Sequence, residues 1–166
     1  PTGWMAAENA ARQAPEQQFL LGGSGWDDHL PENVRRLGHV STRDHNAFNC
    51  SVRMVLNVNR DSMASYGFSP ATRVFEAAGA GACIITDYWI GIEAFLEPDK
   101  EILVARSAED VVAHLKSLTR ERAREIGQAA MKRVLAEHTY AHRAALVEQI
   151  ITEGVAISSG TRPGGL

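Results

Sequence analysis

Residues 56–87 contain the side chains whose types and spacing are best suited to chemistry. Arg60 lies in a polar stretch after an apolar run, and a helix is expected to begin soon after Gly67, with Pro70 as its first residue. The free N–H groups and the dipole of a helix start attract anions, and a guanidinium adds charge-assisted hydrogen bonds to phosphate. Glu76 lies in the middle of that helix, where its carboxylate can accept hydrogen bonds from two vicinal ribose hydroxyls. The segment therefore predicts a site for a diphosphate attached to a sugar.

The same residues also have a plainer interpretation. Arg60 and Arg73 can be solvated, and Glu76 can pair with Arg73, three positions earlier on the helix. Gly79 and Gly81 can be ordinary helix-ending glycines, although they would equally allow a sharp turn and a close approach of helix and sheet. Because ion pairs and glycine caps are common in helices, the residues alone leave both interpretations open.

An alternation of short apolar runs and helical stretches positions this segment. Strands are predicted at residues 18–21, 34–37, 54–58, 82–86 and 101–105. Helices are predicted at 4–14, just after Ser41, at 70–78, near 92–96, and in three amphipathic stretches that follow Ser107. This order is typical of βαβ units. It predicts an α/β fold, namely a Rossmann-like three-layer domain with a parallel sheet of about five strands and C-terminal helices.

Local signals support some of the helix boundaries. Ser41 followed by Asp44 resembles an N-cap with an acidic residue in the first turn. Pro70 after Ser69 suits the first helical position, because proline lacks the N–H that would be unpaired there. Ser107 is expected to cap the helix that follows the last strand.

The predicted order begins with a helix instead of a strand. An α/β nucleotide-binding domain normally starts with a strand whose C-terminal loop leads into that helix. We therefore expect the first strand to be missing, and the sheet to have a gap near its centre or to take a strand from another chain. Since exposed strand edges recruit partners, reduced stability or self-association is also expected.

The composition indicates one globular domain. The chain has 166 residues, of which 45% are hydrophobic and 22% charged, and we assign residues 1–157 to a single domain. The Gly/Ser/Pro-rich residues 158–166 are predicted to be a disordered tail. A net charge of −3 argues against nucleic acid as a partner. No apolar stretch reaches the roughly 20 residues of a membrane span, and the first residues do not resemble a signal peptide. Cys50 and Cys83 are far apart, which favours a reducing, cytoplasmic location.

Three stretches resemble a known family. They are FSPATRVFEAAGAGACIITD (68–87), GIEAFLEPDKEILVA (91–105) and LAEHTYAHRA (135–144). They look like the C-terminal domain of glycosyltransferases with the GT-B fold, specifically the CgeB-like (spore-maturation-type) group, and the resemblance covers about residues 19–150. In such enzymes this half binds the nucleotide-sugar donor and an N-terminal half binds the acceptor. The resemblance implies a nucleotide-diphosphate sugar as donor substrate, no further cofactor, and an N-terminal acceptor-binding domain that this chain lacks. Alone, the chain would be an incomplete enzyme.

The resemblance also implies a donor site. Glu76 would hold the ribose, and Arg60 occupies the loop that approaches the phosphates. The turn before the helix and the helix start would face the diphosphate: Gly67, Phe68, Ser69, Thr72 and Arg73. The residues after the second strand would hold the base, mostly through main-chain contacts and stacking: Gly38, His39 and Val40. Many retaining relatives carry a second glutamate where Phe68 stands, so no catalytic carboxylate is assigned.

Other motifs are given structural interpretations. His138 and His142 stand four apart without a third ligand nearby, so we predict packing and assign no metal site. The glycine-rich residues 22–25 are followed by Trp26, Asp27 and Asp28, which are poor companions for a phosphate. No P-loop and no GxGxxG follows a strand, which disfavours kinases and dinucleotide-dependent enzymes.

Two alternatives accompany the glycosyltransferase hypothesis. The substitution at Phe68 allows a catalytically degenerate transferase-like domain that acts as a binding or assembly module. A flavodoxin-like receiver domain would need a phosphorylatable aspartate after the third strand. That strand ends instead in Val58, Asn59 and Arg60, which disfavours this reading.

Overall fold

The computed structural model describes residues 3–23, 29–59 and 61–159. Its strands all run parallel, which confirms the predicted α/β class. They form a two-stranded sheet, β1–β2, and a three-stranded sheet in the order β3–β4–β5. The strands are β1 Phe19–Gly22, β2 Val34–Gly38, β3 Val55–Asn57, β4 Ile84–Asp87 and β5 Leu103–Ala105.

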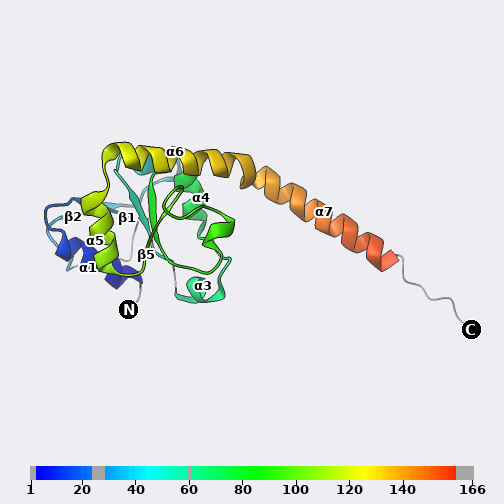
Figure 1. Cartoon of the computed structure of the whole chain (residues 1–166), viewed down its shortest axis with the longest axis horizontal. Coiled ribbons are helices and arrows are strands. Elements are labelled where there is room, and N and C mark those ends of the chain that lie inside the picture. The colour runs from blue at the N-terminus through cyan, green and yellow to red at the C-terminus, as the bar shows by residue number, and fades with distance from the viewer. Residues whose placement is uncertain (1–2, 24–28, 60, 160–166) are drawn as a thin grey trace, which may run out of the picture.

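Helices cover both faces of the strands, and the long α6 crosses one end (Figure 1). The helix α1 packs against α5, and α4 packs against α6. The α-helices are α1 Gly3–Gln13, α2 His45–Cys50, α3 Asp61–Tyr66, α4 Thr72–Gly79, α5 Ala108–Ser117, α6 Arg120–Glu137 and α7 Tyr140–Ser159. Two short 3-10 helices are η1 Thr42–Asp44 and η2 Ile92–Ala94.

Two apolar cores lie on opposite faces of the three-stranded sheet. Ile85 of β4 faces one core, which includes side chains of α1, α5 and α6, whereas its neighbour Ile84 faces the other, which includes side chains of α4 and α6. Successive residues of a strand point to opposite faces, so β4 must be apolar at both positions when both faces are covered. The predicted three-layer arrangement is therefore present.

A buried asparagine fastens α1 to the start of the two-stranded sheet. The Asn33 Nδ2 donates to the carbonyl oxygens of Ala11, Ala14 and Gln17, at 2.9, 3.0 and 3.0 Å. The last carbonyl groups of a helix have no partner within the helix, so a side chain that reaches them stabilises its end. This contact positions α1 beside β1 and β2.

The sequence misplaced some local boundaries. Residues 61–66 were expected to be part of a polar loop, but they form α3; this stretch is too short and polar for helical periodicity to reveal it. The helix α4 begins at Thr72 because Ala71 is still extended, with ψ 141°. Pro70 is therefore not its first residue. Ser41 is the N-cap residue of η1, with Asp44 in the first turn as predicted, although its hydroxyl donates to Asp44 Oδ2 at 2.6 Å and caps no backbone N–H.

The prediction that Ser107 caps the helix after the last strand is confirmed, since its Oγ accepts the N–H of Asp110 at 3.2 Å.

The last helix, α7, projects away from the body of the molecule (Figure 1). Its side chains from residue 141 to 153 are exposed, including Leu146 and Ile150. The helix continues to Ser159, two residues into the predicted tail, and residues 160–166 lie outside the described ranges. None of the helices in the described ranges has the length and apolar character to cross a bilayer.

Candidate functional site

A polar network lies where β3 and β4 end, in an otherwise apolar core. Asp87 Oδ1 accepts hydrogen bonds from the Asn59 N–H at 3.0 Å, from Asn59 Nδ2 at 3.1 Å and from Thr86 Oγ1 at 3.2 Å. The Asn57 Nδ2 donates to Thr86 Oγ1 at 3.0 Å and to Asn59 Oδ1 at 3.4 Å. Asn57, Asn59 and Thr86 are buried. Ligands of open α/β sheets bind outside this edge, so the network forms the floor of a candidate site.

The sequence interpretation missed this network. Its signal was the pattern LNVN at residues 56–59, in which two asparagines interrupt an apolar strand on the same face. Buried polar groups need partners, so a pair of asparagines in a buried strand indicates a hydrogen-bond network. The Asn57 Oδ1 is buried with no partner among the described residues, and the same holds for the Trp89 Nε1.

Four of the ten predicted site residues border one cavity. Arg73 and Glu76 of α4, together with His39 and Val40 after β2, line a cavity of about 970 Å³ that Asn59 also lines. Glu76 and Arg73 are exposed, and in the described part of the chain their side chains form no ion pair or hydrogen bond. The plainer interpretation of an Arg73–Glu76 pair is therefore wrong. Both charged groups are free to meet a ligand.

The turn before α4 is shaped by its own contacts. Gly67 and Phe68 both have positive φ, at 66° and 49°, and the Phe68 N–H donates to the Ile90 carbonyl oxygen at 2.6 Å. The Phe68 ring lies against Gly91, where an added Cβ would come within 2.3 Å of it. The main-chain N–H of Phe68 is thus occupied. Free N–H groups are left at the start of α4, at Thr72 and Arg73, since the Val74 N–H already bonds to Ala71.

The remaining predicted residues do not line this cavity. Gly38 ends β2 with φ 68°, and its carbonyl oxygen accepts the Gly23 N–H at 2.7 Å. Those that lie in the described ranges and outside the cavity lining are Gly38, Gly67, Phe68, Ser69 and Thr72. Arg60, Trp26, Asp27 and Asp28 lie outside the described residues.

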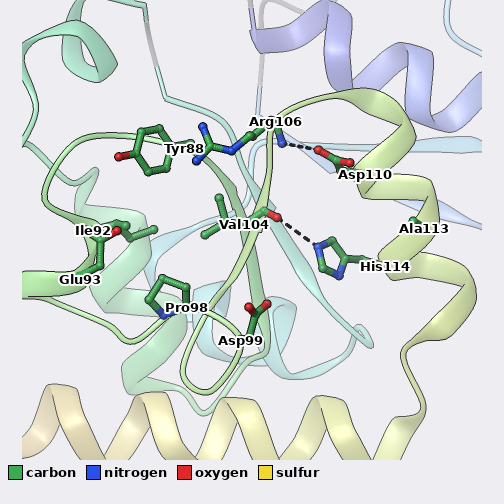
Figure 2. Close-up of a pocket in the computed structure, with 10 residues that line it drawn as sticks. All are labelled: Tyr88, Ile92, Glu93, Pro98, Asp99, Val104, Arg106, Asp110, Ala113 and His114. Atoms are coloured by element: carbon green, nitrogen blue, oxygen red, sulfur yellow. Dashed lines mark hydrogen bonds between the residues drawn. The ribbon is translucent and has the colours of Figure 1, made fainter.

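A second cavity, of about 480 Å³, lies beside β5 and contains none of the ten predicted residues. Figure 2 shows the Arg106 side chain next to the Tyr88 ring, where the guanidinium carbon lies 4.0 Å from the ring centroid. On the other side, His114 Nε2 lies 3.1 Å from the Val104 carbonyl oxygen, which β5 would otherwise leave free at its edge. These contacts protect an edge strand from pairing with other chains. We read this cavity as part of that edge.

His138 lies at the junction of α6 and α7. Its Nε2 is 3.0 Å from the Phe95 carbonyl oxygen and its Nδ1 is 2.9 Å from Arg143 Nη2, so the ring is neutral with its proton on Nε2. Burial, and then the Arg143 charge, lower the pKa of His138. His142 Nδ1 contacts Thr139 Oγ1 at 2.7 Å. Both histidines are therefore engaged with protein atoms, and the described residues contain no cluster of three potential metal ligands.

Comparisons with known proteins bear on this geometry. The chain resembles the sucrose-phosphate synthase of Thermosynechococcus elongatus, with a TM-score of 0.75 and 18% identity over 93% of this chain and 43% of that one. It also resembles AviGT4, a glycosyltransferase involved in avilamycin A biosynthesis, with a TM-score of 0.59 and 18% identity over 96% and 49%. A third similar structure is the GtfA/B complex, with a TM-score of 0.62 and 17% identity over 90% and 32%. The chain therefore spans less than half the length of these proteins.

At these identities the structures establish the fold, which matches part of GT-B glycosyltransferases. No curated protein matched the sequence. The family model described as glycosyl transferase-like matches residues 5–149, which is most of the chain. The segments that supply the strands, the polar network and the charged face of α4 all lie within this match. The chain belongs to the glycosyl transferase-like family.

Proposed function

We propose that this chain binds the nucleotide-sugar donor of a glycosyltransferase at the carboxyl edge of its strands. The observation that carries the proposal is that the exposed side chains of Glu76 and Arg73 do not pair with each other. Both line a cavity that His39 and Val40 also border. An exposed carboxylate and guanidinium that could pair with each other, but do not, remain available for a ligand with both hydroxyl and phosphate groups.

The chemistry of each group assigns its role. The Glu76 carboxylate accepts hydrogen bonds from the two ribose hydroxyls. The Arg73 guanidinium and the free N–H groups at the start of α4 attract the diphosphate, and the dipole of this eight-residue helix adds to that attraction. His39 and Val40 flank the base. Arg60 is proposed as a further phosphate ligand on the family resemblance alone.

The same groups would assist transfer. Negative charge develops on the diphosphate as the bond to the sugar breaks, and fixed positive groups stabilise that charge without reorganisation. Arg73, which lines the cavity, supplies such a group at the start of α4. The acceptor would be bound by an N-terminal half. No catalytic carboxylate is assigned, because Phe68 stands where many retaining relatives have a glutamate, and its ring lies against Gly91.

Calorimetric titration with UDP, GDP and their sugars tests this proposal. We expect Glu76→Gln to weaken binding roughly 10- to 100-fold, which corresponds to the loss of about 1.5–3 kcal/mol of hydrogen bonding to a charged group. Glu16→Gln is the matched control, since Glu16 is also exposed but lies just before β1, at the opposite edge of the strands. Absence of binding by the folded chain, or equal affinity in Glu76→Gln, would overturn the proposal.

One observation favours a second function, a degenerate binding module. The Phe68 N–H is already bonded to Ile90, and the Phe68 ring lies against Gly91, so the turn next to the sugar carries no free acid and no free amide at this position. Such a domain would bind the nucleotide sugar without transferring its sugar to an acceptor. A full-length protein that binds the donor but neither transfers nor hydrolyses its sugar would identify the module.

The finer family and location assignments are also proposals. The order of the segments 68–87, 91–105 and 135–144 supports the CgeB-like group within the family. A cytoplasmic location is supported by the cysteines, since Cys50 is exposed and Cys83 is buried, and both are free thiols. Cell fractionation with an antibody to the full-length protein tests the location.

A further inference from the structure

The Asp87 side chain continues the ladder between β3 and β4 where the main chain leaves it. The Val55 N–H donates to the Cys83 carbonyl oxygen at 2.8 Å. Such bonds recur every second residue along two parallel strands, so a later one would join the Asn59 N–H to the Asp87 carbonyl oxygen. The Asp87 Oδ1 takes that position instead and accepts the Asn59 N–H at 3.0 Å. The carboxylate therefore holds Asn59 beside β4 after β3 has ended.

The same network fixes the orientation of the Asn59 amide. The Asn59 Oδ1 accepts from Asn57 Nδ2 at 3.4 Å, and the Asn59 Nδ2 donates to Asp87 Oδ1 at 3.1 Å. An ionised carboxylate can only accept, so exchanging the two ends of the amide would break the bond to Asp87. The Nδ2 carries two hydrogens, and the second has no partner among the described residues. Since Asn59 lines the cavity of about 970 Å³, it offers one donor of fixed direction to a ligand there.

We propose that this second Asn59 N–H donates to a diphosphate oxygen of the nucleotide sugar, and that Asp87 positions it. The inference rests on the proposed donor site and adds two residues to it. Asn59 touches the ligand, whereas Asp87 acts through Asn59. Asn59 is buried, so its amide lies in a site with little water, where a hydrogen bond to a charged ligand group contributes most.

The position of Asn59 identifies the part of the ligand that it meets. Asn59 follows β3, and α4, which carries Arg73, contacts both β3 and β4. His39, assigned to the base, follows β2, which pairs with β1 in the separate two-stranded sheet. Glu76 accepts from the ribose hydroxyls in the proposed site. Phosphate oxygens only accept hydrogen bonds, so the free amide N–H of Asn59 matches the diphosphate.

The charge of Asp87 makes the direction of the expected effect informative. A carboxylate repels a diphosphate, so its removal alone should strengthen nucleotide binding. If the carboxylate positions Asn59, its removal should weaken binding in spite of the relieved repulsion. The two roles therefore predict opposite changes in the affinity for the same ligand.

Calorimetric titration of single and double variants tests the inference. The ligand is whichever of UDP and GDP the parent chain binds, and the matching nucleoside, uridine or guanosine, is titrated beside it. We expect Asn59→Ala and Asp87→Ala each to weaken diphosphate binding roughly tenfold. Neither should change the affinity for the nucleoside, which has no phosphate. The double variant should bind no more weakly than Asn59→Ala, because Asp87 acts through Asn59.

Asn33→Ala is the control for lost stability. Asn33 is also a buried asparagine with side-chain hydrogen bonds, but it does not line the cavity. Its loss should lower Tm and leave the nucleotide affinity unchanged. Thermal unfolding shows whether each variant is folded during the titration, and Asn59→Ala tests the donor even if Asp87→Ala does not fold.

Three results would overturn the inference. The first is diphosphate binding that is equal or stronger in folded Asn59→Ala or Asp87→Ala. The second is an equal loss of affinity for the nucleotide and its nucleoside, and the third is a further loss in the double variant. In each case the parent chain still binds the nucleotide, so the donor site stands. A parent chain that binds neither UDP nor GDP refutes the donor site and this inference together.

Discussion

The close contact between α6 and the turn after α4 makes Gly127→Ala a sharp test of the fold. A Cβ on Gly127 would lie 2.1 Å from the Gly81 carbonyl oxygen and 3.0 Å from the Ala82 carbonyl carbon. These are backbone atoms, so no side-chain rotation can relieve the overlap. Since ordinary contacts are about 3.5 Å, α6 or the turn must move by about 1.4 Å.

The expected cost follows from two opposing terms. Overpacking costs about 1–3 kcal/mol, and rigid backbone on the far side favours the upper part of that range. Alanine in place of glycine inside a helix returns about 1 kcal/mol. We therefore expect Gly127→Ala to lower the free energy of unfolding by about 1–2 kcal/mol and Tm by about 2–8 °C, given about 2–4 °C per kcal/mol for a chain of this size.

Gly79→Ala is the matched control. Gly79 also lies in a helix, but a Cβ there meets no atom within 4 Å and its φ is not positive. That substitution should raise stability by about 0.4–1 kcal/mol, since alanine restricts the unfolded chain. Thermal unfolding followed by circular dichroism compares both variants with the parent chain. A Gly127→Ala variant that melts at or above the parent temperature would refute the reasoning about this contact.

Three further predictions concern other contacts. Asn33→Ala should lower the free energy of unfolding by about 1–3 kcal/mol in urea titration, because the Nδ2 hydrogen bonds to three carbonyl oxygens are lost, although the Ala14 oxygen keeps the Gln17 N–H. Asn33→Asp should not restore this stability, because a carboxylate cannot donate. Phe68→Gly should raise Tm by a few degrees, since a side chain at φ 49° costs about 1 kcal/mol, and an unchanged Tm would contradict strain at this turn. Burial raises the pKa of the Cys83 thiol to about 11, so the folded state keeps its full stability below the pKa of the unfolded thiol and loses part of it as pH rises toward 11. Cys83→Ala should remove that part of the alkaline loss measured by urea titration, and Cys50→Ala, at an exposed thiol, should not.

The predicted strands were found because apolar runs of this kind are locally encoded. The predicted strands at 54–58 and 82–86 correspond to β3 and β4, and residues of β4 are buried on both faces. The division into two sheets was anticipated as a central gap, since the chain reads as helix first. The grouping of the strands into the sheets β1–β2 and β3–β4–β5 depends on contacts between residues that are distant in sequence. Local sequence patterns do not reveal such contacts.

The candidate site was predicted less completely. Glu76 was identified by its position on a helix. The sequence did not show whether its carboxylate pairs with Arg73, and only the structure shows that the two side chains do not pair. The start of α4 was misplaced because Ala71, after Pro70, is still extended, and the sequence gives no local sign of this conformation. Asp87 was not identified, since its role depends on Asn59, which is distant in sequence.

The division of the strands has a mechanical consequence for the molecule. Within the described residues, the ladder of β1 and β2 shares no backbone hydrogen bonds with that of β3, β4 and β5, and side chains such as Arg53, which bonds to Gln17 at 2.9 Å, bridge them. Proteins open locally in contiguous cooperative units that often coincide with supersecondary motifs, so two separate ladders can open at different free energies. The β1–β2 pair should thus open at a lower free energy than the ladder of β3, β4 and β5.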